Sequence, residues 1–298
     1  MEQNIPLAIA LVVVGSFCYA LSSSFQHRAV RRQVRRNAEN RPVGFRALWE
    51  AVRSKRWLAG MALLGTSAVL QVAALALAPV TVVQPVGLLA FPWSILIQAR
   101  LHRQRVRGRV GLAVAFTVAS TAAFTTVSAL HAVTQSALHG AAVVTGALVV
   151  YLLTLVFGLL GAKGPQHWRC LLWSSGGAML YGLEAALVKS VIAFIRTADW
   201  KHSPLMWVIL VALVIGSTTA GWMIQQGLAT GPSEVVVGST TITSPVIAVA
   251  YGIAVLGEGR LMTVGVGAMM GVFAALAVTG VVLLTRLDKS WQDRALLK

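Results

Sequence analysis

The chain is poor in acidic residues, and one of them stands in unusual surroundings. Aspartate and glutamate together make up 9 of its 298 residues, and Glu184 falls near the middle of a long apolar stretch. A carboxyl group in such surroundings must be paired with a basic group, be protonated, or take part in the function of the protein. Glu184 is therefore a functional candidate by default. Tyr181 lies one helical turn before it, on the same helix face. This pair can transfer a proton or bind a cation or an amine; a structural pairing of Glu184 with a basic group elsewhere is the alternative.

Uncharged polar residues also fall within the apolar stretches. Tyr19, Ser22 and Gln26 form a stripe at helical spacing, and residues 238–244 carry a run of hydroxyl groups. Such residues can line a binding site, hold neighbouring helices together, or bond to the backbone of their own helix. The candidate substrate-binding and coupling residues are Glu184, Tyr181, Tyr19, Ser22, Gln26, Gln71, Gln84, Trp93, Thr240, Thr241 and Ser244.

Three prolines are predicted to break helices inside apolar stretches. Pro85 and Pro92 fall in one stretch and Pro245 in another. Each removes a backbone hydrogen bond and crowds the preceding turn. In a membrane, the carbonyl left without a partner must face the protein interior or water. These two stretches are therefore expected to line a pathway through the protein.

Patterns that would indicate catalysis or metal binding are missing from the sequence. There is no GxxxxGK[ST] phosphate loop, no HExxH pair and no paired-carboxylate pattern. The 6 histidines are scattered, and the 2 cysteines, Cys18 and Cys170, indicate no metal site. The sequence therefore predicts no enzyme activity, no metal site and no cofactor.

The elements that must position the candidate residues are membrane-spanning helices. Hydrophobic residues make up 57% of the chain, charged residues make up 11%, and the mean hydropathy is +0.75, which excludes an ordinary soluble domain. The apolar blocks are long enough to cross about 30 Å of hydrocarbon, which takes about 20 helical residues. Nine spans are predicted, at residues 5–26, 57–77, 80–97, 110–130, 138–160, 170–195, 205–227, 233–255 and 262–284.

The basic residues indicate how these spans are oriented. The net charge is +16, and 21 of the 25 lysines and arginines follow odd-numbered spans, whereas three follow even-numbered ones. Because basic loops stay in the cytoplasm, we expect a protein of the cytoplasmic (inner) membrane with its N-terminus outside and its C-terminus inside. The basic loops are expected to contact anionic lipid headgroups rather than nucleic acid.

Two pairs of spans are similar to each other in sequence. "PVTVVQPVGLLAFPWSIL" from Pro79 aligns with "PSEVVVGSTTITSPVIAV" from Pro232, and "GSFCYALSSSFQH" aligns with "GAMLYGLEAALVK", which places Tyr19 on Tyr181. Corresponding spans are five apart, an odd number, so the two halves would face opposite ways, as in many secondary transporters. Coincidental similarity between apolar helices is the alternative.

The predicted fold is therefore an all-α polytopic membrane protein with nine transmembrane helices, in which two inverted four-helix repeats are joined by a connecting helix. The predicted parts are a first repeat at 1–135 with a basic cytoplasmic loop at 28–56, the connecting helix at 136–165, the second repeat at 166–285 and a cytoplasmic tail at 286–298.

The chain resembles the drug/metabolite transporter (EamA-like) superfamily, and within it most resembles the NIPA-like magnesium-transporter branch. The resemblance is carried by "QVAALALAPVTVVQPVG" from Gln71 to Gly87, by "GSFCYALSSSFQHRAV" and by "VAYGIAVLGEGR". It implies two inverted helical repeats around a central cavity. NIPA-like proteins have acidic residues near these passages, whereas the span at 57–77 has Gln71 and no carboxylate. Because Mg²⁺ prefers carboxylate and water oxygens, this departure favours an organic substrate.

Four functions remain open from the sequence. The leading hypothesis is a secondary transporter or exporter that moves a small metabolite or amphipathic organic compound across the cytoplasmic membrane. The alternatives are a flippase for a polyprenyl- or glycerol-phosphate-linked lipid, a Mg²⁺ transporter, and a non-transporting membrane scaffold. The expected partners are membrane lipids and a small-molecule or lipid substrate, and the sequence indicates no particular oligomeric state.

Overall fold

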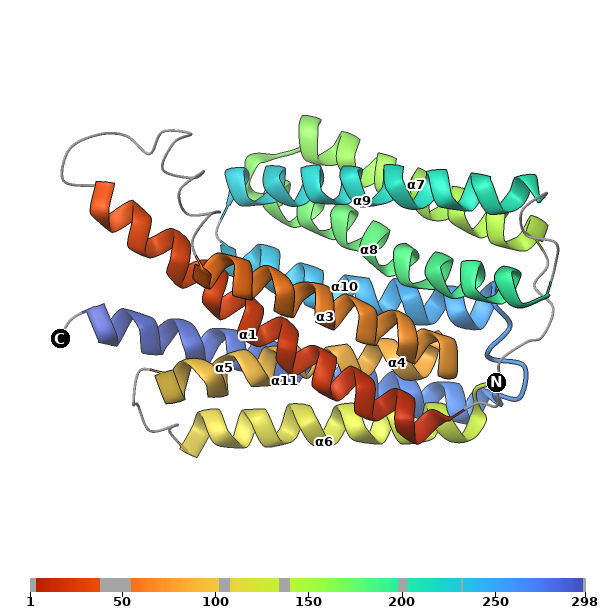
Figure 1. Ribbon diagram of the computed structural model, residues 1–298, viewed down its shortest axis with the longest axis horizontal. Coiled ribbons are helices and arrows are strands. Elements are labelled where there is room, and N and C mark those ends of the chain that lie inside the picture. Colours follow the sequence, from red (N-terminus) through yellow and green to blue (C-terminus); the bar gives the residue numbers. More distant parts are fainter. Residues whose placement is uncertain are drawn as a thin grey trace.

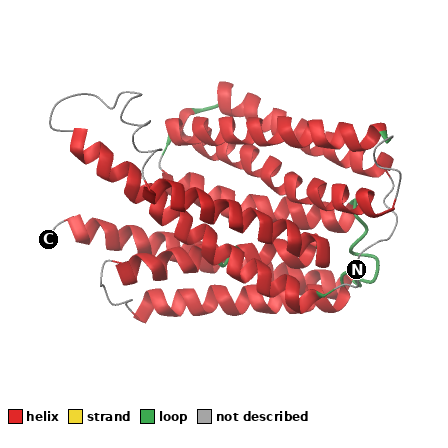
Figure 2. Ribbon diagram, in the orientation of Figure 1, coloured by secondary structure: helices red, strands yellow, loops and turns green. Residues whose placement is uncertain are grey.

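The computed structural model describes residues 4–37, 55–101, 108–133, 140–197, 203–231 and 233–296, with the backbone alone at 26–37, 56, 197, 233–234 and 285–296. These residues form helices joined by short turns and include no strand (Figure 2). The helices are α1 (Ile5–Asn37), α3 (Lys55–Leu77), α4 (Val80–Gly87), α5 (Ala90–Leu101), α6 (Gly108–His131), α7 (Gly140–Lys163), α8 (Gln166–Thr197), α9 (Pro204–Thr230), α10 (Ser233–Ala254) and α11 (Val264–Leu296).

The predicted nine-span membrane architecture is confirmed. Within the described residues, nine helical segments are long and apolar enough to cross a membrane, and each coincides with a predicted span to within a few residues. The third is built from α4 and α5 together, as Val80–Leu101. Helix α1 begins and α11 ends at opposite ends of the bundle (Figure 1), as an odd number of spans requires. The protein is an all-α polytopic membrane protein.

Two helices continue beyond the predicted spans. The basic region predicted as a loop at 28–56 begins as a helix, because α1 continues to Asn37; residues 38–54 lie outside the described residues. The predicted tail at 286–298 likewise begins as helix, since α11 continues to Leu296. Hydropathy marks where apolar residues end, whereas a helix can continue into polar sequence that forms no hydrophobic block.

The surface of the bundle is apolar, as a lipid environment requires. Large hydrophobic side chains such as Leu152 and Leu155 on α7 and Val211 and Val214 on α9 are more than half exposed. Polar side chains are buried between helices instead, and Ser175 on α8 and Ser239 on α10 share a hydrogen bond of 2.6 Å. Because lipid solvates apolar side chains, polar groups gather inside.

The helices pack in two similar groups. Helix α1 packs extensively on α3 and also contacts α4 and α5, while α8 packs extensively on α9 and α10. Between the groups, α4 contacts α10 and α6 packs on α11. These pairings match those expected if the first four spans correspond to the last four, with α7 between them. The internal repeat itself stays a prediction.

Only part of the predicted helix breaking occurs. The third span is interrupted at Leu88 and Leu89, where the N–H of Leu88 donates to the carbonyl of Pro85 at 3.0 Å in a tight turn. Pro92 follows four residues after Leu88, so it cannot supply the N–H that the Leu88 carbonyl would need in a continuous helix.

Pro85 and Pro245 do not break their helices, contrary to the prediction. Pro85 lies inside the short helix α4, and α10 continues through Pro245. The residue whose carbonyl loses its helical partner to Pro245 is Thr241. Thr241 lines a cavity, where water can replace the missing hydrogen bond.

Close packing of α6 on α11 depends on Gly280. A methyl group added at Gly280 would meet Thr117 Oγ1 and lie 3.1 Å from Thr117 Cα, whereas one added at Gly271 on the same helix would have nothing within 4 Å. We expect Gly280→Ala to lower the free energy of unfolding by about 1–3 kcal/mol through overpacking, and Gly271→Ala not to lower it. Unfolding in mixed micelles measures the free energy of unfolding of both variants. Equal stability of the two variants would contradict this packing.

Candidate functional site

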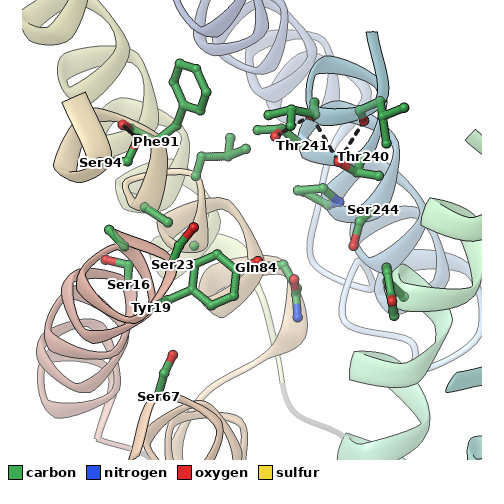
Figure 3. Close-up of a pocket in the computed structure, with 18 of the residues that line it drawn as sticks. Ser16, Tyr19, Ser23, Ser67, Gln84, Phe91, Ser94, Thr240, Thr241 and Ser244 are labelled. Atoms are coloured by element: carbon green, nitrogen blue, oxygen red, sulfur yellow. Dashed lines mark hydrogen bonds between the residues drawn. The ribbon is translucent and has the colours of Figure 1, made fainter. Parts of the chain in front are cut away.

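A cavity of about 810 Å³ lies between the two groups of helices. Its walls come from α1 and α3 on one side, from α4 and α5 on another, and from α8, α9 and α10 opposite (Figure 3). Ser67, Tyr181 and Ser244 line it near the middle of the spans formed by α3, α8 and α10. The cavity therefore reaches the centre of the bundle.

Along the helix axes, the cavity extends from just beyond the middle of the bundle, where Gln84 lies, to one end. Its lining includes Val236 and Val237 at the start of α10, Leu228 near the end of α9 and Gln98 near the end of α5, and these three termini lie at the same end of the bundle (Figure 1). We call this the cavity end. Tyr19 of α1 points into the cavity (Figure 3) and is 52% exposed, so the interior is accessible.

The opposite end of the bundle is closed by a hydrophobic core. It is built by the beginnings of α1 and α4 and by the ends of α3 and α8, and includes Val12, Leu75, Val80, Val83 and Leu187, all at most 2% exposed. The cavity is thus a one-sided pocket and not a pore through the protein.

Most of the predicted site residues line this cavity. They come from five different helices and comprise Tyr19, Gln71, Gln84, Tyr181, Thr240, Thr241 and Ser244, together with Pro245. The cavity thus joins the polar stripe on α1 to the hydroxyl run on α10, which face each other in Figure 3.

Corresponding positions of the two aligned spans face the same cavity. In the alignment that places Pro79 on Pro232, four pairs of residues line it: Gln84 and Val237, Gly87 and Thr240, Leu88 and Thr241, Phe91 and Ser244. Tyr19 and Tyr181, aligned in the other pair of spans, also line it. This is the arrangement expected when an inverted repeat encloses a central site.

Ser22 and Trp93 were predicted to be site residues, but they do not line the cavity. Ser22 is buried and donates a 2.7 Å hydrogen bond to the carbonyl of Gly60, so it joins α1 to α3. Trp93 packs edge-on against Phe17 with the ring centroids 5.5 Å apart, and its Nε1 is buried. Among polar residues in a helical stripe, small hydroxyls fit best where two backbones approach, which explains the role of Ser22.

The remaining predicted positions fall elsewhere. Pro85 and Pro92 are buried in the third span and do not line the cavity. The side chain of Gln26 lies outside the part of the chain whose side chains are described.

Glu184 is close to the cavity but does not line it. It interacts with Ser217 of α9, with Tyr151 of α7 and with Tyr181 of its own helix, and its Oε1 is buried without a hydrogen bond in the described part of the chain. Because three residues turn a helix through about 300°, Glu184 and Tyr181 point about 60° apart. Tyr181 therefore faces the cavity while Glu184 faces the space between α7, α8 and α9.

Several cavity residues were not among the predicted ones. Ser16, Ser67, Ser94 and Gln98 all line the cavity. Ser16 lies three residues before Tyr19, Ser67 four before Gln71, and Gln98 four after Ser94, so each shares a helix face with another lining residue. Helical spacing from the predicted residues Tyr19 and Gln71 could have identified Ser16 and Ser67, whereas no predicted lining residue on α5 indicates Ser94 and Gln98.

Two buried charges meet the junction between α3 and α4, a contact that the sequence did not predict. Lys189 of α8 donates from Nζ to the carbonyls of Leu75 and Ala78, at 2.6 Å and 2.8 Å. Glu258, in the turn between α10 and α11, accepts from the N–H groups of Val80 and Thr81, at 2.7 Å and 2.8 Å. We call this pair the clasp.

The clasp matches the electrostatics of the two helix ends. The end of α3 carries partial negative charge and receives the ammonium group, and the start of α4 carries partial positive charge and receives the carboxylate. Both side chains are buried, with Lys189 7% and Glu258 1% exposed. They also attract each other. The clasp therefore satisfies four backbone groups that the junction would otherwise leave unpaired inside the protein.

The backbone around Glu258 holds its side chain in place. Gly257 has a φ of 68°, which favours glycine, and the N–H of Glu258 donates to the carbonyl of Gly252 at 3.0 Å. Burial raises the pKa of the Glu258 carboxyl above its usual range, while its bonds to α4 and the charge of Lys189 act in the opposite direction. The carboxyl consequently takes up a proton at a higher pH than an exposed glutamate does.

Breaking the clasp is expected to destabilise the protein. Lys189→Met and Glu258→Ala should each lower the free energy of unfolding by about 3–5 kcal/mol, because each leaves a buried charge and two backbone groups unpaired. The double variant should lose less unfolding free energy than the sum of the two single losses, since the two charges interact. Chemical unfolding followed by tryptophan fluorescence measures these values. Lys163→Met, at an exposed lysine near the end of α7, is the control, and a loss equal to that of Lys189→Met would contradict the clasp.

The described residues offer little to a metal ion. None of their histidine, cysteine, aspartate or glutamate side chains gather in a group of three or more that could hold one. The described lining of the cavity contains hydroxyl, amide and apolar groups and no carboxylate. Such a lining suits an organic molecule better than Mg²⁺, which binds through carboxylates and water.

Compared with family models, curated proteins and solved structures, the chain has no match. The resemblance to the drug/metabolite transporter superfamily and its NIPA-like branch therefore stays a prediction from short sequence stretches. The fold and the cavity by themselves define a multi-pass helical membrane protein with a one-sided central pocket.

Proposed function

We propose that the protein is a secondary transporter that moves a small organic compound across the membrane. The observation that carries this proposal is the cavity, which reaches the middle of a nine-span bundle and is closed at one end. A pocket at this depth, between two similar groups of helices, is where secondary transporters bind their substrates. A non-transporting scaffold protein would not require such a pocket.

The one-sided cavity corresponds to one state of an alternating-access cycle. The cavity end is the end at which α1 and α11 finish (Figure 1), and the arginine-rich sequence after residue 25 begins there. The positive-inside rule assigns this end to the cytoplasm. In our proposal the pocket is therefore loaded or emptied from the cytoplasm, and the clasp and the surrounding core separate when it opens to the other side.

Of the alternative functions, the Mg²⁺ pathway has the least support, because no carboxylate lines the described part of the cavity. A flippase would need an opening from the cavity between helices toward the lipid. Flux of water-soluble compounds and flipping of labelled lipids can be measured in the same reconstituted vesicles, so one preparation separates the two functions.

Transport is expected to depend on the side chains that line the middle of the cavity. In proteoliposomes loaded with a compound library, the wild type should exchange at least one compound, and Gln71→Ala or Tyr19→Ala should lower that exchange by about tenfold through lost hydrogen bonds. The control is Gln166→Ala, at an exposed glutamine at the start of α8. Equal exchange by the control and the cavity variants would contradict this site.

Glu184 is proposed to carry the coupling proton, because its buried Oε1 has no hydrogen bond within the described residues and it lies one turn from the cavity residue Tyr181. Glu184→Gln keeps the shape of the side chain and removes the titratable group. Uptake driven by a pH gradient should fall about tenfold or more, while exchange without a gradient should persist because Glu184 does not line the cavity. Unchanged gradient-driven uptake would remove Glu184 from the mechanism.

A further inference from the structure

We propose that the solute is an uncharged organic compound rich in hydrogen-bond donors, which carries hydroxyl or amide groups beside less polar parts. Sugars linked to a nonpolar group and nucleosides are compounds of this class. This inference rests on the proposed transport function, and it concerns the chemistry of the pocket rather than the existence of transport.

The first argument is the charge of the pocket. The described side chains that line it include no lysine, arginine, aspartate or glutamate. A charged group that moves from water into such surroundings loses its hydration without gaining an opposite charge. Lys189 and Glu258 are already engaged with the α3–α4 junction, and Glu184 does not line the pocket. An ionic solute would therefore be left unpaired in the pocket.

The second argument is the state of the hydroxyl groups. Ser16, Ser94, Thr240 and Thr241 each donate to a backbone carbonyl of their own helix, at 2.7–2.9 Å. A hydroxyl that has donated its proton keeps its oxygen lone pairs as acceptors. These four groups therefore present acceptors to the pocket, and acceptors attract O–H and N–H donors and disfavour anions such as phosphate and carboxylate.

The third argument is the pair of glutamines in the inner part of the pocket. Gln84 lies in α4 close to the closed core and Gln71 in the second half of α3, and both line the pocket. A primary amide both donates and accepts, so two of them can match the hydroxyl or amide pattern of a neutral molecule. Each is electrically neutral and gives no Coulombic advantage to an ion.

The fourth argument is the mixed lining and the size of the pocket. Polar side chains such as Ser67 and Gln98 line it along its length, together with apolar ones such as Leu88 and Leu228. A solute that carries hydroxyl or amide groups beside less polar parts matches such a lining. The volume of about 810 Å³ is within the range of about 300–1,000 Å³ that is typical of pockets for such small molecules.

The test compares matched neutral and charged compounds in proteoliposomes. One pair is uridine and uridine 5′-monophosphate, a second is methyl β-glucoside and glucose 6-phosphate, and tetraphenylphosphonium represents apolar cations within a wider library of such pairs. We expect a neutral member to be exchanged, and its charged partner to be exchanged about tenfold more slowly or not at all, because the pocket cannot compensate the charge. A charged member that is exchanged as fast as its neutral partner would overturn the proposal.

The outcomes separate this inference from the proposed function. If the only exchanged compounds in the library are charged, the protein is a transporter and the inferred substrate class is wrong. If no compound is exchanged by protein that is shown to be folded, both the transport function and the substrate class fail.

Substitution within the pocket gives a second measure. Gln84→Glu introduces a carboxylate next to the bound solute, so exchange of the neutral compound should fall by about tenfold and a cationic analogue should gain, since the carboxylate now compensates its charge. Gln71→Glu repeats the test from α3 in case the first variant does not fold. The control is Gln166→Glu, the same change at an exposed helix start. Unaltered selectivity in both folded pocket variants would overturn the proposal.

Discussion

The structure depends on how the junction between α3 and α4 is satisfied inside the protein. Where one helix ends and the next begins, backbone carbonyl and N–H groups lose their helical partners, and burial makes such losses costly. Lys189 and Glu258 supply the missing partners from the other group of helices. One pair of charges thereby completes the backbone, balances its own charge and joins the two groups at the end where the cavity is closed.

Much of the fold was predictable because a membrane span is recorded locally in the sequence: a run of apolar residues must form a helix, whatever its neighbours are. The clasp was not predictable in this way. Lys189 is a single basic residue in an apolar span and Glu258 a residue in a turn, and the backbone groups that they bind lie more than 100 positions away. Only the packing of the spans brings them together.

The candidate site was predictable to an intermediate degree, for a related reason. Polar residues inside apolar spans stand out in a sequence, so Tyr19, Gln71, Gln84 and Thr240 were identified before their surroundings were known. The sequence does not show what lies opposite each of them. Ser22 meets the backbone of α3 and Glu184 meets α7 and α9, although each lies within one turn of a cavity residue. The distinction between binding and packing arises from tertiary contacts.

The interruption of the third span at Leu88 and Leu89 gives that span a joint. The part before the joint, α4, packs on α1 and α6 and also on α10 and α8, whereas α5 packs mainly on α1. The half of the span formed by α4 thus makes most of the contacts across the interface. Gly87 and Leu88, at the joint, belong to the wall of the cavity. A solute in the cavity therefore lies directly against the joint, and the joint leads into α4, the helix whose first N–H groups Glu258 binds.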